Sequence, residues 1–572
     1  MTTLLKAAVL VAPLLVAACT SAPPPLAMND ARCQDIVKGA LPQGFGAGRI
    51  TKAEWFAAGK LKIEQPPNLA GEYELPAHCS VEGRLNERTG VDGKPYAMGF
   101  NLRLPQNWNS RFVFQGGGGT DGVTLPALGY VSSSARLHAP LALTRGFAVV
   151  STDAGHQNEP GPVGSFLFGF DPQARNELGH AHLPAVSQAA NALIRQSYGV
   201  APKQRYFMGC SNGGRQGMMA AQRYPELFDG ILVGAPAYRV SQAAAEATQQ
   251  TQALTPVAPK DANGRPLLGS ALSRDELNLL SKGVLDACDA SDGVRDGMVH
   301  DIAGCKFTPQ ALQCRAGDTG EGKTCLSAAK VAAVDKVFKG SRKADGALVY
   351  SNWPWDPALN HPGWIVWRLG MNPTAMPPSA INAALIPGAM AFAFMSPPEP
   401  GLTSTLDLYD FALRFNLERD LPRVSATSGI FKDASTDFNN ATSTNLDPFT
   451  ARGGKLVFFH GAADPIFSAN DTVRYLEQLR ARDGAAKVDT YARLYLVPGM
   501  THCRGGDATD VFDLLPALQD WVEKGQAPVT PVATGFAGSK FANRSRPLCA
   551  WPQQAFYKGS GDSEDAANFV CR

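Results

Sequence analysis

Short apolar runs alternate with segments of helical periodicity in two blocks of the chain. The predicted strands of the first block are residues 111–115, 146–152, 205–209 and 230–233, and its predicted helices are residues 183–198 and 212–224. The second block has predicted strands at residues 455–460 and 491–497 and predicted helices at residues 471–479 and 510–523. Strands and helices that alternate at this spacing are typical of a parallel sheet, so we expect an α/β fold with a mostly parallel sheet flanked by helices.

The residues between the two blocks have a different character. They are rich in proline, tryptophan and small residues, and their strand signals are weak. We expect residues 238–442 to form a lid domain inserted into a catalytic domain made of residues 31–237 and 443–572. Such an insertion can cover the carboxyl edge of the sheet, where α/β folds place their sites. The length of 572 residues, too great for one compact core, agrees with this division.

The first 18 residues predict a lipoprotein-type signal peptide. Lys6 precedes an apolar run over residues 7–18 that is too short to span a bilayer, and the sequence VAAC at residues 16–19 resembles a lipobox. In this interpretation Cys19 is lipidated and residues 19–30 form a tether; ordinary signal cleavage nearby is the alternative. We expect an exported protein, periplasmic, anchored to the outer membrane or extracellular, that meets a membrane only through its lipid.

Export changes how the eleven cysteines are interpreted. Once Cys19 is set aside an even number remains, which permits a full set of disulfides in an oxidising compartment. Local spacing suggests three pairs and leaves four cysteines unassigned. The suggested pairs are Cys288 with Cys305, Cys314 with Cys325, and Cys549 with Cys571; the unassigned residues are Cys33, Cys79, Cys210 and Cys503. The net charge of +2 gives no indication of a nucleic-acid partner, and we expect a monomer.

The most specific local motif is GCSNG at residues 209–213. It fits the pattern G-x-S-x-G, and it lies between a predicted strand and a predicted helix, which is the context that a nucleophile elbow requires. The alternative is a chance match in a glycine-rich loop, which the flanking elements disfavour. We therefore expect Ser211 to be the nucleophile of a serine hydrolase.

A serine nucleophile needs a base and an acid that orients the base. Asp464 follows the predicted strand 455–460, and His502 follows the predicted strand 491–497. The chain order Ser, Asp, His is that of the α/β-hydrolase fold, so we assign Ser211, Asp464 and His502 as the catalytic triad. The competing base is His460, which lies close to Asp464 and precedes it, and we expect it to be structural.

The glycine run at residues 116–119 is expected to supply part of an oxyanion hole. Glycines let the backbone approach a substrate oxygen without interference from Cβ atoms, and two backbone N–H donors are needed. We expect these donors to be Gly119 and Asn212, the residue after the nucleophile. A phosphate-binding loop is disfavoured, because no GK[ST] sequence follows.

Cys210 directly precedes Ser211, and Cys503 directly follows His502. If the serine and histidine are in contact, their neighbours are near enough for a disulfide that fastens the two loops together. Two free buried thiols are the alternative, less common in an exported protein.

These residues together resemble the signature of the tannase and feruloyl esterase family. The resemblance covers nearly all of the mature chain, residues 33–571. It implies a serine carboxylesterase that cleaves small aromatic-acid esters through an acyl-enzyme, without an organic cofactor. It also implies the disulfides Cys33–Cys79 and Cys210–Cys503 in addition to the three local pairs.

Residues 289–298 carry three aspartates at short spacing with glycines between them, a pattern that suits a hard cation such as Ca²⁺. From the residues alone, a solvated acidic turn is an equal alternative. The family resemblance implies a structural calcium site in the lid. Its expected ligands are the side chains of Asp289, Asp292 and Asp296 and the carbonyls of Val294 and Met298.

The substrate is less well determined. The lid stretch 353–394 is aromatic and apolar, which fits either a clamp for an aromatic ring or the core of the lid itself. Trp367 and Phe467 resemble pocket residues of the family. Feruloyl or galloyl esters are the expected substrates.

A terephthalate half-ester is the alternative substrate within the family. The enzyme for that substrate holds the free carboxylate with a lid arginine, but residues 371–394 contain no Arg or Lys here, and Asn212 replaces a glutamate. Arg368 is a candidate substitute. Other classes that remain open are a serine peptidase, although no propeller repeat accompanies the motifs, and a non-catalytic surface lipoprotein.

Overall fold

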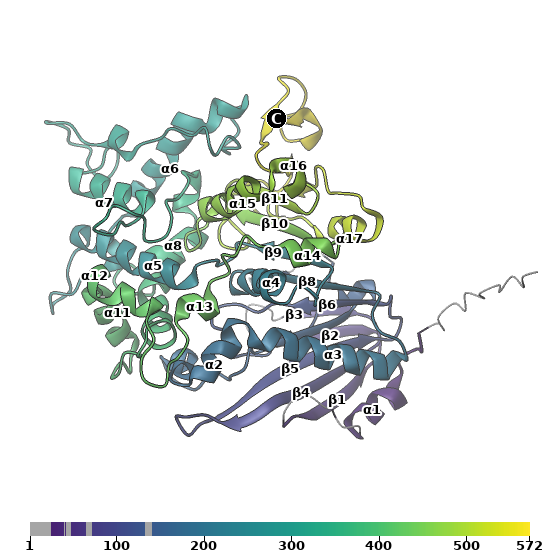
Figure 1. Cartoon of the computed structure of the whole chain (residues 1–572). Helices are drawn as coiled ribbons and strands as arrows, with labels where there is room; N and C mark the ends of the chain where they lie inside the picture. The colour runs from purple at the N-terminus through teal and green to yellow at the C-terminus, as the bar shows by residue number, and fades with distance from the viewer. Residues whose placement is uncertain (1–24, 39–40, 42–46, 65–70, 132–139) are drawn as a thin grey trace, which may run out of the picture.

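A computed structural model describes residues 25–38, 41, 47–64, 71–131 and 140–572 (Figure 1). The expected signal peptide, Cys19 and part of the tether lie outside these residues. A nine-stranded sheet forms the centre of the molecule, in the order β1-β4-β5-β7-β6-β8-β9-β10-β11. Its strands are β1 (Arg49–Phe56), β4 (His78–Thr89), β5 (Pro95–Pro105), β6 (Arg111–Gln115), β7 (Ala148–Thr152), β8 (Gln204–Cys210), β9 (Gly230–Gly234), β10 (Lys455–Gly461) and β11 (Ala492–Val497).

Six neighbouring strands of this sheet, from β7 to β11 in its order, are parallel. At the other edge, β1, β4, β5 and β7 pair antiparallel. The predicted α/β fold with a mostly parallel sheet is therefore confirmed. The hydrophobic pattern of the sequence does not predict the strands β4 and β5. Polar residues, among them Asn101 and Arg103, are buried within β5 and interrupt that pattern.

Alternate side chains of each parallel strand enter different cores. Phe112 and Phe114 of β6 pack with one cluster, and Val113 between them packs with another on the opposite face. The first cluster is completed by α1 (Asp30–Lys38), α3 (His182–Tyr198), α4 (Asn212–Arg223) and α15 (Ala469–Asp483), and the second by α17 (Leu515–Lys524) and the hairpin β2 (Gly59–Ile63)–β3 (Gly71–Leu75).

The structure corrects the predicted helix 510–523, since α17 begins only at Leu515. Val511 instead exchanges backbone hydrogen bonds with Thr534, which keeps this stretch extended. The remaining short strands of the C-terminal part are β12 (Val532–Thr534), β13 (Ser545–Pro547), β14 (Ala555–Tyr557) and β15 (Phe569–Cys571), and α16 (Ala485–Val488) precedes β11.

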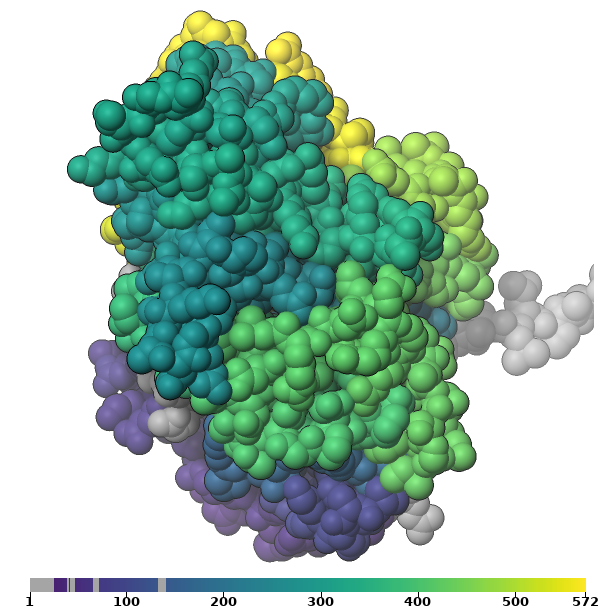
Figure 2. All heavy atoms as spheres, turned by 90° about the vertical axis from the view of Figure 1, so that its left-hand side faces the viewer, coloured from purple at the N-terminus to yellow at the C-terminus, as the bar shows by residue number. Residues whose placement is uncertain are grey.

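The chain between β9 and β10 is helical and contributes no strand to the nine-stranded sheet. Most of its helices gather at one side of the sheet in Figure 1, and Figure 2 shows them covering that side. They are α5 (Val240–Leu254), α6 (Arg274–Cys288), α7 (Ala328–Lys339), α8 (Pro362–Arg368), α9 (Ile381–Ala384), α10 (Ile386–Gly388), η10 (Ala389–Phe394), α11 (Thr405–Arg414), α12 (Leu417–Asp420) and α13 (Ser435–Asn439). The last helix before β10, α14 (Asp447–Ala451), lies apart from them in Figure 1, and its Phe449 packs into the first cluster of the sheet.

This helical segment packs on the sheet domain through two hydrophobic clusters. One cluster includes Ile466 and Phe467, which follow β10. The other includes Phe166 and Phe168 of η3 (Gly164–Phe170) and also contacts the short helix α2 (Pro172–Asn176). Both contacts come from loops at the carboxyl ends of strands, so the segment lies over the sheet edge where a site is expected.

Five disulfides join described parts of the chain, and all five expected pairs are confirmed. They are Cys33–Cys79, Cys210–Cys503, Cys288–Cys305, Cys314–Cys325 and Cys549–Cys571. Disulfides in this number are typical of proteins that fold in an oxidising compartment. Among the described residues, no helix is long and apolar enough to cross a membrane.

Candidate active site

Ser211 stands on a sharp turn between β8, which ends at Cys210, and α4, which begins at Asn212. Its backbone is strained, with φ 64° and ψ −125°. The turn requires small neighbours: a Cβ added to Gly213 would lie 2.6 Å from the carbonyl oxygen of Gly117. The sequence therefore folds into the nucleophile elbow that the motif predicts, with Ser211 at the edge of a cavity.

Asp464 and His502 are brought together from the loops after β10 and β11. His502 Nδ1 donates to Asp464 Oδ2 at 2.7 Å, while Asp464 Oδ1 accepts from the backbone N–H groups of Ile466 and Phe467. Burial opposes the charge on Asp464, but the attraction of His502 and hydrogen bonds from both neighbouring histidines hold the pKa of its carboxyl well below its usual range. A buried, ionised carboxylate thus fixes the orientation of the His502 ring.

His460 supports this arrangement from behind. Its Nδ1 lies 2.8 Å from Thr472 Oγ1, its Nε2 lies 2.9 Å from the carbonyl oxygen of Phe467, and the side chain is fully buried. Nε2 is also 3.5 Å from Asp464 Oδ2. Both ring nitrogens are engaged within the protein, which agrees with the structural role expected for His460.

The Cys210–Cys503 disulfide joins the nucleophile turn to the histidine loop, with a Cα–Cα distance of 6.0 Å. Like Ser211, Cys503 has a positive φ, 65°. In this conformation no hydrogen bond joins the Ser211 hydroxyl to His502, whose Nε2 lies 3.7 Å from Cys503 Sγ. Catalytic hydrogen bonds of this kind often become short only when substrate is bound.

A cavity of about 390 Å³ opens at Ser211 between the sheet domain and the helical segment. Trp367 and Phe467, both expected at the substrate site, line it. Their rings meet His502 edge to face, with centroid distances of 5.1 and 5.5 Å. The lining is otherwise mostly apolar, and Asp121 is its only charged side chain among the described residues. Such a shape and lining suit a small, uncharged aromatic group.

Several cavity residues were not foreseen from the sequence. They are contributed by η3 and its surroundings, by α5, by the turn from α9 to η10 and by the loop after β10: Asn158, Ser165, Phe166, Val240, Ala244, Ile381, Leu385, Ile386, Ala389, Phe394 and Ile466. The apolar character of the stretch 353–394 was the only signal for some of them, because apolar residues of a lid core and of a pocket share the same pattern.

Gly119 and Asn212, the expected oxyanion donors, both line this cavity. The glycine loop that follows β6 packs directly on the start of α4: the nitrogen of Gly117 donates to Gln216 Oε1 at 3.1 Å. Gly119 has φ 58°, and a Cβ there would meet no atom within 4 Å, so its glycine serves the backbone conformation rather than close packing.

Arg368 lies elsewhere. Its side chain is buried, donates to Gln250 Oε1, and stacks its guanidinium 4.9 Å from the Trp353 ring and 5.2 Å from the Trp364 ring. Arg368 is not among the residues that line the cavity at Ser211. Trp353 and Trp364 belong to the core of the helical segment, as the alternative interpretation of the tryptophans held.

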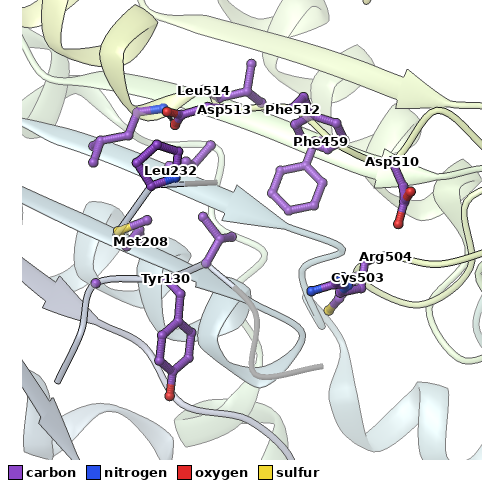
Figure 3. A pocket seen from close by; sticks show the side chains of 14 residues that line it. Tyr130, Met208, Leu232, Phe459, Cys503, Arg504, Asp510, Phe512, Asp513 and Leu514 are labelled. Atoms are coloured by element: carbon purple, nitrogen blue, oxygen red, sulfur yellow. Dashed lines mark hydrogen bonds between the residues drawn. The ribbon is translucent and has the colours of Figure 1, made fainter. Parts of the chain in front are cut away.

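A second, smaller cavity lies beside the disulfide (Figure 3). It measures about 90 Å³, and Cys503 lines it together with Met208, Leu232 and Phe459, which come from three neighbouring strands. No member of the expected triad borders it. Of the expected triad, Ser211 lines the larger cavity instead.

The acidic loop 289–298 holds some but not all of the features of a calcium site. Asp289, Asp292 and the Asp296 carboxylate are all buried, and burial with the charges of the other two aspartates raises the pKa of Asp292 to about 7. These are donors that a hard cation prefers. However, Asp296 pairs with Arg546, and no three acidic, histidine or cysteine side chains among the described residues are grouped so as to hold a metal ion.

Comparison with known proteins identifies this architecture. The family profile described as tannase and feruloyl esterase matches residues 79–572. The chain belongs to the tannase and feruloyl esterase family. It is a carboxylesterase with the α/β-hydrolase fold, as the motifs indicated.

Relatives of known name lie within the same family. Mono(2-hydroxyethyl) terephthalate hydrolase from Piscinibacter sakaiensis is 41% identical over 535 residues, which cover 88% of this chain and 86% of that protein. A probable feruloyl esterase from Arthroderma benhamiae is 30% identical over 510 residues, 86% of this chain and 85% of that protein. The crystal structure of feruloyl esterase B from Aspergillus oryzae has a TM-score of 0.75 at 21% identity, covering 95% of this chain and all of that one, and shares the fold.

Proposed function

We propose that this carboxylesterase hydrolyses esters of neutral aromatic acids, of the feruloyl or galloyl type, through an acyl-enzyme on Ser211. The observation that supports this most is the cavity at Ser211, in which the rings of Trp367 and Phe467 stand beside His502. An apolar slot with aromatic walls favours a planar acyl group placed next to the nucleophile.

The roles follow from the positions of the three side chains. Ser211 attacks the ester carbonyl while His502 takes the hydroxyl proton, and the same proton then goes to the departing alcohol. Asp464, held by two backbone N–H groups, orients His502 and stabilises its protonated ring. Water, activated by His502, hydrolyses the acyl-enzyme and releases the aromatic acid.

The developing negative charge on the carbonyl oxygen needs two donors. In our proposal these are the backbone N–H groups of Gly119 and Asn212, which border the same cavity. The glycine loop and the first turn of α4 would hold the oxyanion between them.

A terephthalate half-ester is the second candidate substrate, favoured by the relative from Piscinibacter sakaiensis. That substrate carries a carboxylate. The described lining of the cavity contains no Arg or Lys to pair with it, and its single charged residue, Asp121, is itself an acid. The charge of the lining therefore favours the neutral ester.

Kinetics on matched esters separate the two candidates. Purified protein is assayed with methyl ferulate, methyl gallate, dimethyl terephthalate and monomethyl terephthalate; the last two differ mainly in one negative charge. We expect kcat/KM for the diester to exceed that for the monoester at least tenfold. Equal values, or a preference for the monoester, would overturn the choice of neutral substrates.

We also propose a structural role for calcium at the loop 289–298. The buried carboxylates of Asp289 and Asp292 support it, whereas the ion pair of Asp296 with Arg546 competes with a cation. The site would stabilise the helical segment and take no part in the chemistry. Attachment through a lipid on Cys19 is likewise a proposal, which mass spectrometry of the mature N-terminus tests.

A further inference from the structure

Four side chains form a buried network between the glycine loop and α4. Asp121 accepts hydrogen bonds from Asn212 Nδ2 through Oδ1 and from Gln216 Nε2, at 2.8 Å, through Oδ2. Asn212 Oδ1 in turn accepts from Arg215 Nε at 2.8 Å, and Gln216 Oε1 accepts from the nitrogen of Gly117. Asp121 thus connects with the two segments that carry the oxyanion donors.

The orientation of both amides is fixed by their other partners. If Asn212 were turned over, its NH₂ group would face the Nε–H of Arg215; if Gln216 were turned over, its NH₂ group would face the N–H of Gly117. Each amide must therefore present its NH₂ group to Asp121. Position 121 has to accept one hydrogen bond through each of its two terminal atoms, which an ionised carboxylate does and an amide, with one oxygen and one NH₂ group, cannot.

The backbone around Asp121 belongs to the same arrangement. Asp121 has φ 49°, unusual for a residue with a Cβ, and its nitrogen donates to the carbonyl oxygen of Gly118 at 2.9 Å. Gly119 therefore lies inside a turn that Asp121 closes. A change in the contact between Asp121 and α4 would move Gly119 relative to the backbone of Asn212.

We propose that Asp121 is a positioning residue of the oxyanion hole, and that it acts only as the ionised carboxylate. The inference rests on the proposed function, since the oxyanion hole belongs to that proposal. Asp121 does not touch the reacting atoms in this scheme; it sets the separation of the Gly119 and Asn212 donors.

The energetics agree with a functional rather than a stabilising role. Burial raises the pKa of Asp121 to about 6 even though two amides and the charge of Arg215 favour the anion. A carboxyl whose pKa is higher in the folded than in the unfolded state contributes stability at low pH and loses it as the pH rises through about 6. At neutral pH the ionised network therefore costs stability. The other charged group facing it is Asp153, whose pKa burial raises to about 7.

The test compares Asp121→Asn with Asp153→Asn. Asp153 is an equally buried carboxyl close to Asp121, but its partners are the nitrogens of Gly99 and Gly155 and the side chain of Gln157, none of which lies in α4. The proposal expects Asp121→Asn to lower kcat for methyl ferulate at pH 8 by about ten- to a hundredfold with little change in KM, less than the roughly hundred- to thousandfold loss seen when an oxyanion donor is removed, because here the donor is only displaced. Asp153→Asn is expected to stay within about threefold of the parent kcat on the same scale.

Two further readouts separate positioning from mere support of the fold. Phenylboronic acid, which forms a tetrahedral adduct with a serine, is expected to inhibit Asp121→Asn more weakly by a factor close to the loss in kcat. The melting temperature of Asp121→Asn relative to the parent is expected to increase between pH 5 and pH 8, because the variant lacks the ionisation that costs stability. Gln216→Leu, which removes one donor to Asp121, repeats the kinetic test if Asp121→Asn does not fold.

Unchanged kcat and boronate affinity in a folded Asp121→Asn, while Ser211→Ala is inactive, would overturn this inference alone. An equal loss of kcat in Asp153→Asn would also overturn it, because the effect would then not depend on contact with α4. Retained turnover in Ser211→Ala would overturn the proposed function and this inference with it.

Discussion

Replacing both Cys210 and Cys503 with alanine is expected to lower turnover per folded molecule as well as stability. The bridge connects the residue before the nucleophile to the residue after the base, and both Ser211 and Cys503 hold backbone conformations with positive φ. Strained positions of this kind persist only where the surrounding structure enforces them. Without the bridge, we expect the histidine loop to relax away from Ser211.

The size of each effect can be worked from the structure. The bridge spans a sequence separation of 293 residues, for which the loop-entropy model gives about 5–6 kcal/mol as an upper figure. A displacement of about 1 Å between nucleophile and base costs up to about a hundredfold in rate. We therefore expect a clear fall in melting temperature and a loss of ten- to a hundredfold in kcat, by the same principle of orientation.

The assay needs a control that loses a disulfide far from the triad. Cys549→Ala with Cys571→Ala removes a bridge with a separation of 22 residues between the loop after β13 and the end of β15, worth about 3 kcal/mol in the same model. Melting is followed by circular dichroism, the folded fraction is measured at the assay temperature, and kcat for methyl ferulate is divided by that fraction.

The control is expected to melt earlier and to keep its kcat. If the Cys210/Cys503 variant also keeps its kcat per folded molecule, the bridge only stabilises the fold and the positioning argument is wrong. If peptide mapping of the parent finds these two thiols free or paired elsewhere, the premise fails.

Three further outcomes follow from the same structure. Trp367→Ala is expected to raise KM for methyl ferulate about tenfold, because it removes an aromatic wall of the cavity. The ring of Trp355 stacks on that of Phe338 at a centroid distance of 3.8 Å, so Trp355→Ala should lower the melting temperature and leave KM unchanged. The reverse pattern would contradict the substrate assignment. Chelation of calcium is expected to lower the melting temperature without changing kcat, and Asp292→Asn should remove that response; a parent insensitive to chelator and free of calcium in metal analysis would refute the site. Burial lowers the pKa of His156 and of His182 to about 3. These neutral rings therefore contribute stability above about pH 6.5 that is lost as the pH falls toward 3. His156→Gln should flatten the acid part of a curve of unfolding free energy against pH, and an unchanged curve would refute this.

Local patterns in the sequence were enough to place the three residues of the proposed triad in loops at strand ends. The strand 111–115 was predicted with its observed bounds, and the serine, aspartate and histidine were each placed in a loop after a strand because glycines and strand ends mark such loops directly. Three disulfides followed from local spacing, Cys210–Cys503 from its position beside the expected triad together with the family resemblance, and Cys33–Cys79 from the resemblance alone.

The features that could not be predicted from the sequence depend on contacts between distant segments. The antiparallel strands β4 and β5 were missed because Asn101 and Ser80 bury polar side chains against each other, which removes the alternation that marks a strand. Arg368 was expected near the substrate, but a partner on α5 and two tryptophan rings hold it in the lid core. The role inferred for Asp121 needs the bonds to α4, which are 91 and 95 residues away.

The central claim is that Ser211 carries the acyl group. The most direct measurement is to quench the enzyme with acid during turnover of methyl ferulate and to map the acylated peptide by mass spectrometry. We expect a feruloyl group on the peptide that contains Ser211, with neither adduct nor turnover in Ser211→Ala. An adduct on another residue, or turnover retained by Ser211→Ala, would contradict the account.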